Sequence, residues 1–167
     1  MGLLSWLFGK GSSEPQVVEE QIDWSSYWGD VELKAEHSVM TSEGMSFKEC
    51  LSYFKNILET EFPEYTTRAA VPVEDVVGQL NEEFKLYETR PHQAYKAEWG
   101  APYSFVMYKD GKVAAIIMVT EKWCHNKHVK QLISKMYAKK LDVPYIQFYT
   151  QFENNVRYVV SRLLKHL

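Results

Sequence analysis

The sequence predicts a mixed α/β domain, and three local patterns lead to this prediction. They are a capped amphipathic helix near residue 46, an apolar hairpin around residue 110, and a strand–helix–strand unit towards the carboxyl end. The chain has 167 residues, 46% of them hydrophobic and 14% aromatic, which is enough to fill one core. We therefore expect one domain over residues 23–167, preceded by a flexible tail and linker over residues 1–22.

The first helix is predicted by its cap. Ser46 and Glu49 stand three residues apart ahead of an apolar run, an arrangement in which each side chain can satisfy the other residue's main-chain N–H. Apolar residues then recur at helical spacing as far as Leu58, and Pro63 closes the element. These features predict a helix over about 46–60.

A short strand is predicted next. The stretch "YTTRAAV" over 65–71 is rich in β-branched residues and ends at Pro72. Residues 73–100 begin with helical character that Gly78 interrupts and continue as irregular chain. Composition does not fix the structure of this insertion.

The hairpin consists of "YSFVMY" and "VAAIIMVT", joined across Asp110-Gly111. Asp-Gly readily adopts the positive φ angles that a two-residue hairpin turn requires. The second run is apolar at nearly every position from 113 to 119, which predicts a central strand covered on both faces.

The carboxyl-terminal third predicts a parallel crossover. We expect Asn126 to cap an amphipathic helix with a basic outer side, followed by the strand "VPYIQFYT". A strand–helix–strand passage of this length implies parallel strands. A last helix opens at Asn154 or Asn155. The predicted architecture is a mixed central sheet with flanking helices, in the order α-β-β-β-α-β plus a carboxyl-terminal helix.

This order, over residues 46–167, resembles the core of the PD-(D/E)XK restriction-endonuclease-like superfamily. The stretches "PYSFVMYKDGKVAAIIMV" and "HVKQLISKMYAKKLDVPYIQFYTQFENNVRYVVSRLLKHL" are similar to small bacterial nuclease-like domains. The resemblance implies an Asp at the start of the first hairpin strand and a Glu-x-Lys on the second. In the family these groups hold a divalent metal ion and position water for phosphodiester hydrolysis.

The resemblance also implies that this site is degenerate. Ser104 stands at the position of the Asp, and Ile117 and Val119 stand at those of the Glu and the Lys. These side chains supply neither the carboxylates that Mg²⁺ prefers nor the cation. Shifting the register reaches only Glu121 and the adjacent Lys122, whose side chains point to opposite faces of a strand. We expect no catalytic residue, no metal ligand and no cofactor at these positions.

Charge is distributed unevenly along the chain. Residues 122–167 carry nine Lys and Arg against two Asp and Glu, whereas residues 1–121 carry ten against twenty. A basic segment can follow a phosphate backbone, and an ordinary solvated helix surface is the alternative explanation. The candidate nucleic-acid-binding residues are Lys127, Lys130, Lys135, Lys139, Arg157, Arg162 and Lys165.

Three functions follow from these observations. The leading one is a non-catalytic binding module that holds a partner protein or nucleic acid against its basic carboxyl-terminal helices. The second is an active Mg²⁺-dependent nuclease with relocated acids, Glu98 or Asp110 together with Glu121. The third is a structural or assembly protein whose residues 1–10, "MGLLSWLFGK", dock weakly on a membrane surface or a partner.

Two further features concern location and metals. The chain has two cysteines, Cys50 and Cys124, and its start lacks the pattern of a secretory signal, so we expect a cytoplasmic protein. The cluster of Cys124, His125 and His128 has some of the side chains that zinc prefers. A buried thiol beside two loop or surface histidines is the interpretation that we favour.

Overall fold

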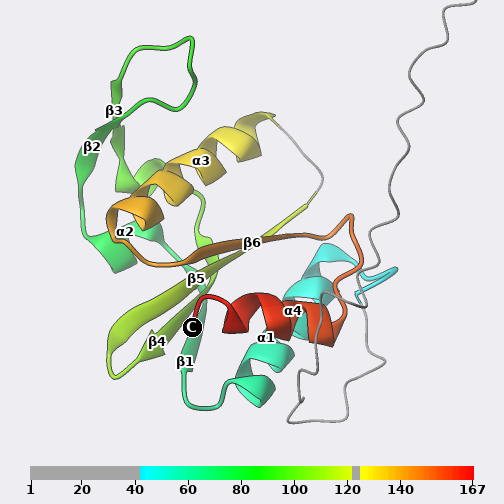
Figure 1. Cartoon of the computed structure of the whole chain (residues 1–167). Coiled ribbons are helices and arrows are strands. Elements are labelled where there is room, and N and C mark those ends of the chain that lie inside the picture. Colours follow the sequence, from blue (N-terminus) through cyan, green and yellow to red (C-terminus); the bar gives the residue numbers. More distant parts are fainter. Residues whose placement is uncertain (1–41, 122–124) are drawn as a thin grey trace, which may run out of the picture.

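The computed structural model describes residues 42–121 and 125–167. Outside the described residues lie the predicted tail and linker, the amphipathic segment at residues 1–10, the domain boundary at residue 23, and Cys124. The described chain forms a four-stranded sheet with helices on both faces and a separate two-stranded sheet (Figure 1). The mixed α/β class predicted from the sequence is therefore confirmed.

The main sheet contains β1 (Thr66–Val71), β4 (Tyr103–Lys109), β5 (Lys112–Thr120) and β6 (Tyr145–Tyr149), in the spatial order β1-β4-β5-β6. Both β1 and β5 run antiparallel to β4, and β6 runs parallel to β5. The hairpin turn is the predicted one, because Asp110 and Gly111 have φ angles of 50° and 75°.

Helix α1 (Phe47–Glu61) begins with the predicted reciprocal cap. The Ser46 N–H donates to Glu49 Oε2 over 2.8 Å, and the Glu49 N–H donates to Ser46 Oγ over 3.4 Å. The Ser46 hydroxyl also donates to the same carboxylate oxygen over 2.6 Å. The Ser46 hydroxyl and, to a smaller extent, the Ser46 N–H lower the pKa of Glu49 from its usual value, because both stabilise the ionised carboxylate.

Helices cover the two faces of the sheet separately. On one face, α1 and α4 (Val156–Leu164) pack together over Ile117 and Val119 of β5. On the other face, α3 (His125–Lys140) packs over Ile116 and Met118. The central strand is thus covered on both sides, as its unbroken apolar run predicted.

The predicted parallel crossover is confirmed, since α3 connects β5 to β6. The cap predicted at Asn126 is wrong, because α3 begins at His125 and Asn126 lies within its first turn. At α4 the choice between two asparagines is settled: Asn155 is the N-cap, and its Oδ1 accepts from the Tyr158 N–H over 2.9 Å.

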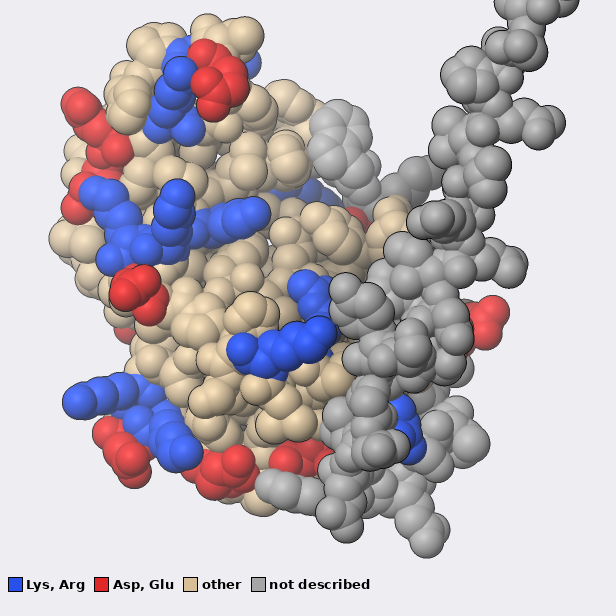
Figure 2. Space-filling view, viewed as in Figure 1, with Lys and Arg blue, Asp and Glu red and all other residues tan. Residues whose placement is uncertain are grey.

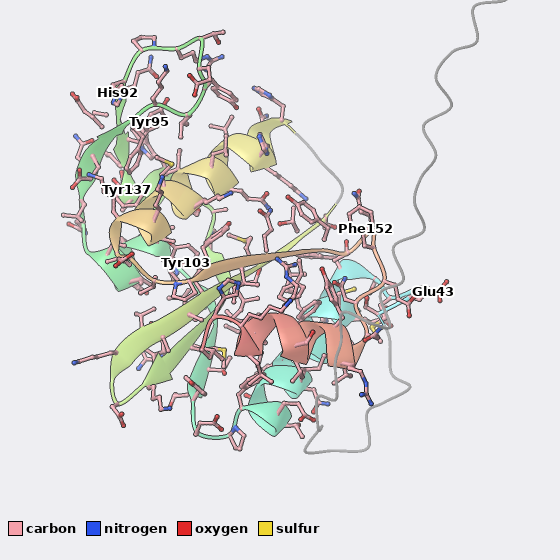
Figure 3. The ribbon with its side chains drawn as sticks, viewed as in Figure 1. Glu43, His92, Tyr95, Tyr103, Tyr137 and Phe152 are labelled. Atoms are coloured by element: carbon pink, nitrogen blue, oxygen red, sulfur yellow. The ribbon has the colours of Figure 1, made fainter. Side chains whose placement is uncertain are left out.

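The insertion at 73–100 is more ordered than its composition indicated. It contains α2 (Val73–Val77), β2 (Asn81–Phe84), β3 (Gln93–Lys96) and the 3-10 helix η2 (Ala97–Trp99), and among the described strands β2 pairs with β3 alone. Tyr137 of α3 fixes its position, because the Tyr137 hydroxyl donates to the carbonyls of Leu80 and Tyr95 over 2.9 and 2.5 Å. Figure 3 shows Tyr95 and Tyr137 on neighbouring elements at this junction. The insertion therefore extends the α3 side of the molecule.

The lengths of the helices also bear on membrane insertion. Over residues 42–121 and 125–167, none of the helices combines the length and the apolar composition needed to cross a bilayer.

Candidate functional site

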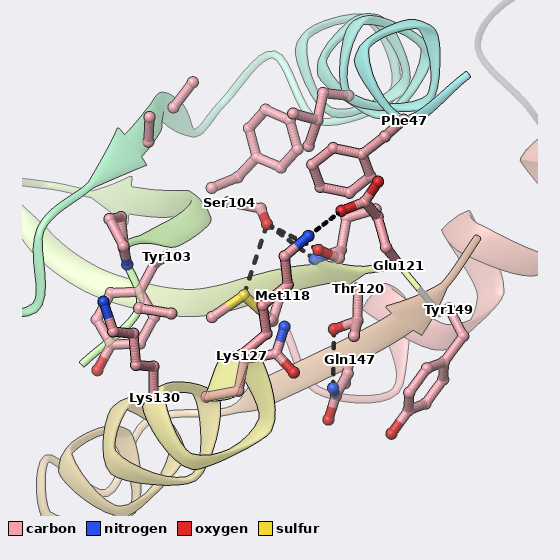
Figure 4. A pocket seen from close by; sticks show the side chains of 18 of the residues that line it. Phe47, Tyr103, Ser104, Met118, Thr120, Glu121, Lys127, Lys130, Gln147 and Tyr149 are labelled. Carbon is pink, nitrogen blue, oxygen red and sulfur yellow. Dashed lines mark hydrogen bonds and ion pairs between the residues drawn. The ribbon is translucent and has the colours of Figure 1, made fainter. Parts of the chain in front are cut away.

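A pocket of about 570 Å³ opens at the end of the main sheet, where β4 begins and where β5 and β6 end (Figure 4). Helix α1 forms one wall and the segment 127–135 of α3 forms the opposite wall. Much of the lining is apolar, including Phe47, Leu51, Pro102, Met118 and Leu132. The pocket can therefore accommodate a ligand that has an apolar or aromatic part.

The charged residues that line the pocket are predominantly cationic. They are Lys55 from α1, Lys127, Lys130 and Lys135 from α3, and one acid, Glu121. Lys127 Nζ lies 2.5 Å from Glu121 Oε2, and Lys55 Nζ lies 2.6 Å from Glu59 Oε1 outside the pocket. Both ion pairs are substantially exposed, so water and salt weaken them. An anionic ligand can therefore compete for the lysines.

Ser104 closes the inner end of the pocket. Its Oγ accepts a hydrogen bond from the Val119 main-chain N–H over 2.9 Å. The paired register of β4 and β5 reaches only as far as Phe105 opposite Ile117. The serine oxygen thus satisfies a strand donor beyond the last paired residues, which is a structural role for the side chain.

The other two positions of the predicted degenerate site face the protein interior. Ile117 is 0% exposed and Val119 is 2% exposed, and both pack in the cluster formed with α1 and α4. Neither these residues nor Ser104 presents an acid or a cation to the pocket.

Two of the relocated acids of the nuclease alternative, Asp110 and Glu121, lie at opposite ends of β5. Asp110 lies in the hairpin turn and Glu121 follows the far end of β5, so the nine-residue strand separates them by about 30 Å at roughly 3.3 Å per residue. Glu98 lies in η2, and its Oε1 is 3.7 Å from Lys96 Nζ. The pairing of Asp110 with Glu121 at one metal ion is therefore wrong.

Potential metal ligands are also dispersed. Within the part of the chain that the structure describes, no group of three or more His, Cys, Asp or Glu side chains is placed to hold a metal ion. His125 and His128 lie in the first turn of α3, and His128 lines the pocket. Cys50 is a buried free thiol of α1, and its burial raises the pKa of the thiol.

The predicted basic residues do not form a single surface. Lys127, Lys130 and Lys135 line the pocket, whereas Lys139 lies near the end of α3 outside it. Arg157, Arg162 and Lys165 belong to α4 and its C-cap, and α4 packs on the opposite face of the sheet from α3. Figure 2 shows Lys and Arg in separate groups with uncharged surface between them.

Arg162 has a structural role. Its guanidinium donates to the Gln147 carbonyl over 2.9 Å and to the Tyr158 hydroxyl over 3.1 Å. The same group lies 4.8 Å from the centre of the Phe148 ring. Arg162 therefore joins α4 to the edge strand β6.

Exposed aromatic side chains lie next to the pocket. Tyr149, which lines it, is 41% exposed, and Phe152 in the following turn is 61% exposed. Their ring centres are 6.2 Å apart in an edge-to-face arrangement. The turn is held by Asn154, whose Nδ2 donates to the carbonyls of Tyr149 and Phe152 over 3.0 and 2.9 Å.

Lys55 and this aromatic pair are site residues that the sequence did not predict. Helical spacing places Lys55 on the outer face of α1, and nothing in that spacing connects it with α3. For Tyr149 and Phe152, the sequence shows only one aromatic residue at the end of a strand and a second in the polar turn that follows. Their relation to the lysines depends on the fold.

Comparison with known proteins gives no independent guide to this site. A scan against protein-family models and searches of curated proteins and of solved structures found no match to the chain.

Proposed function

We propose that the chain is a non-catalytic domain of the PD-(D/E)XK-like nuclease type that binds single-stranded nucleic acid in the pocket between α1 and α3. The observation that carries this proposal is the composition of the pocket. Four lysines line an apolar cavity, while Ser104 and the buried Ile117 and Val119 stand where the resemblance places the catalytic groups.

The strand arrangement supports the nuclease-like part of the proposal. Outside the insertion, the elements follow the order α1, β1, β4, β5, α3, β6, and the three antiparallel strands adjoin one parallel strand. This is the α-β-β-β-α-β order that suggested the resemblance. The pocket lies at the beginning of β4 and the end of β5, which are the segments to which the family's acids and lysine map.

The chemistry of the lining supports a nucleic-acid ligand. Lysine ammonium groups can contact phosphates, and exposed aromatic rings can stack on unpaired bases. Tyr149 lines the pocket together with the lysines of α3, and the exposed Phe152 ring lies edge-to-face against Tyr149. A duplex keeps its bases stacked inside, so a combination of cations, rings and a concave apolar surface favours a single strand.

A protein partner is the main alternative ligand, because an acidic peptide with aromatic residues presents similar chemistry to the pocket. The cytoplasmic location stays a prediction, and the free thiol of Cys50 is compatible with a reducing compartment.

The test is fluorescence anisotropy of a labelled 20-nucleotide single strand and of its duplex, titrated with the full chain at several NaCl concentrations. Each phosphate contact contributes about 0.7 to the slope of log K against log[salt] for a single strand. Three lysines of α3 therefore predict a contribution of about 2 to that slope. We expect K127A/K130A/K135A to lose this contribution and to weaken binding strongly at low salt.

The matched control is K85A/K109A/K112A, which removes the same charge from exposed lysines outside the pocket. Equal losses in the two triple variants, or no binding at low salt, would contradict the proposal. The titration is repeated with Mg²⁺ and with chelator. Shortening of the strand with Mg²⁺ alone would contradict the non-catalytic part and support the nuclease alternative.

A further inference from the structure

The amino-terminal part of the chain has the charge and composition complementary to the pocket. Residues 11–33 contain six acidic residues and no Lys or Arg. Within them, the stretch "DWSSYWGDVE" over 23–32 combines three acids with Trp24, Tyr27 and Trp28. Carboxylates interspersed with large aromatic rings are the chemistry that a lysine-lined apolar pocket accommodates.

The point at which the described chain begins is close enough for this segment to reach the pocket. Ser42 is anchored, because its Oγ accepts from the Asn154 N–H over 3.1 Å. Phe47, five residues later, already forms part of the pocket wall. Figure 3 shows Glu43 and Phe152 at the same end of the molecule, beside α1 and α4. Ten residues from 32 to 42 can span about 33 Å when extended, whereas the five steps from Ser42 to Phe47 in the pocket wall cover at most about 18 Å.

We infer that residues 23–32 bind in the pocket between α1 and α3 of the same chain. Their carboxylates approach Lys127, Lys130 and Lys135, and their aromatic rings contact the apolar walls. The short connection raises the local concentration of the segment to the millimolar range, so modest intrinsic affinity suffices for occupancy.

This interaction has a regulatory consequence, which rests on the proposed function. A segment that fills the pocket nine-tenths of the time weakens the apparent affinity for a competing strand about tenfold. A nucleic acid strand whose phosphates contact several of the lysines displaces the segment. Anionic ligands that bind the pocket more weakly do not displace the segment and are therefore excluded.

Zero-length carbodiimide cross-linking of the full chain tests the contact directly. The reaction is carried out at low micromolar concentration and the monomer band is analysed by peptide mass spectrometry. We expect links from Asp30 or Glu32 to lysines of α3 that line the pocket, at least several-fold more frequent than links to Lys109 or Lys112. Links spread evenly over all exposed lysines would overturn the inference, and links confined to a dimer band would assign the pocket to a second copy instead.

Two variants of equal charge separate specific docking from a general effect of the acidic tail. D23N/D30N/E32Q neutralises three acids within the segment, and E14Q/E19Q/E20Q neutralises three acids before it. The first variant should bind the single strand about tenfold more tightly than the unmodified chain, and the second should change affinity less than twofold. Equal gains in the two variants would overturn the inference.

The two readouts also distinguish this inference from the proposed function. If the chain does not bind the strand at low salt, the proposed function fails, while the cross-links still decide whether the segment occupies the pocket. If the chain binds the strand but lacks the specific cross-links, the inference fails and the proposed function stands.

Discussion

Replacing Ser104 with Ala tests whether this side chain maintains the end of the β4–β5 hairpin. The substitution removes the oxygen that lies 2.9 Å from the Val119 main-chain nitrogen and leaves that donor without its strand-side partner. A hydrogen bond contributes about 0.5–1.5 kcal/mol net, and a buried donor left unpaired costs about 1–3 kcal/mol. Ser104 is half-buried beside an open pocket, so water can partly replace it. We therefore expect a loss of about 1–2 kcal/mol in the free energy of unfolding.

Urea denaturation followed by intrinsic fluorescence measures this loss as a shift in the midpoint at unchanged slope. Ser52→Ala is the matched control, because the Ser52 hydroxyl donates to the Lys48 carbonyl over 3.2 Å on the exposed side of α1. Its effect should stay within about 0.5 kcal/mol. Ser104→Thr keeps the hydroxyl and should restore most of the loss.

Hydrogen exchange at the Val119 amide gives a second measurement at the site itself. The amide should exchange faster in Ser104→Ala than in the unmodified protein. The structural explanation of Ser104 would be refuted if Ser104→Ala and Ser52→Ala had equal stability and if Val119 exchange were unchanged.

Two further substitutions test contacts at the ends of the helices. Arg162→Met removes the guanidinium that donates to the Gln147 carbonyl and lies over Phe148, so thermal or urea unfolding should register a loss of about 1–3 kcal/mol. Arg162→Lys should recover only part of it, since an ammonium lacks the planar donor geometry, and full recovery would contradict this account. Ser46→Ala should lower stability by about 1 kcal/mol at pH 7 through loss of the α1 cap. Because the native pKa of Glu49 is lowered, the stability that its carboxylate contributes is present above the ordinary pKa of 4.5 and is lost as pH falls through the lower native value. The loss of stability caused by Ser46→Ala should therefore shrink in acid. A cost independent of pH from 7 to 3 would contradict the reciprocal cap.

The elements that could be predicted from the sequence are those fixed by local chemistry. The Ser46–Glu49 cap, the Asp110-Gly111 turn and the Asn155 cap each depend on residues within three positions of one another. The small sheet β2–β3 was not predicted, because its position depends on hydrogen bonds from Tyr137, more than forty residues later in the chain. Local patterns carry no information about such a partner.

The site was only partly predictable for the same reason. Helical spacing correctly placed Lys127, Lys130 and Lys135 on the outside of α3, and these are the residues that line the pocket. Charge counting along the chain also grouped them with Arg157 and Lys165, although α4 packs on the opposite face of the sheet. Basic residues that are close in the sequence therefore lie on different surfaces, because α3 and α4 pack on opposite faces of the sheet.

The contacts of Asn154 have a consequence for how the domain folds. The Tyr53 hydroxyl donates to the Asn154 carbonyl over 2.8 Å, and the two residues are 101 positions apart in the sequence. The Asn154 N–H donates to the Oγ of Ser42, which lies 112 positions earlier. The first helix of the described chain therefore completes its packing only against the last one. During synthesis, the part of α1 that packs on α4 stays uncovered until α4 has left the ribosome, and a truncated chain that ends before Asn154 exposes that part to aggregation. Contacts of such long sequence separation also slow folding, because the intervening chain must lose entropy before they form.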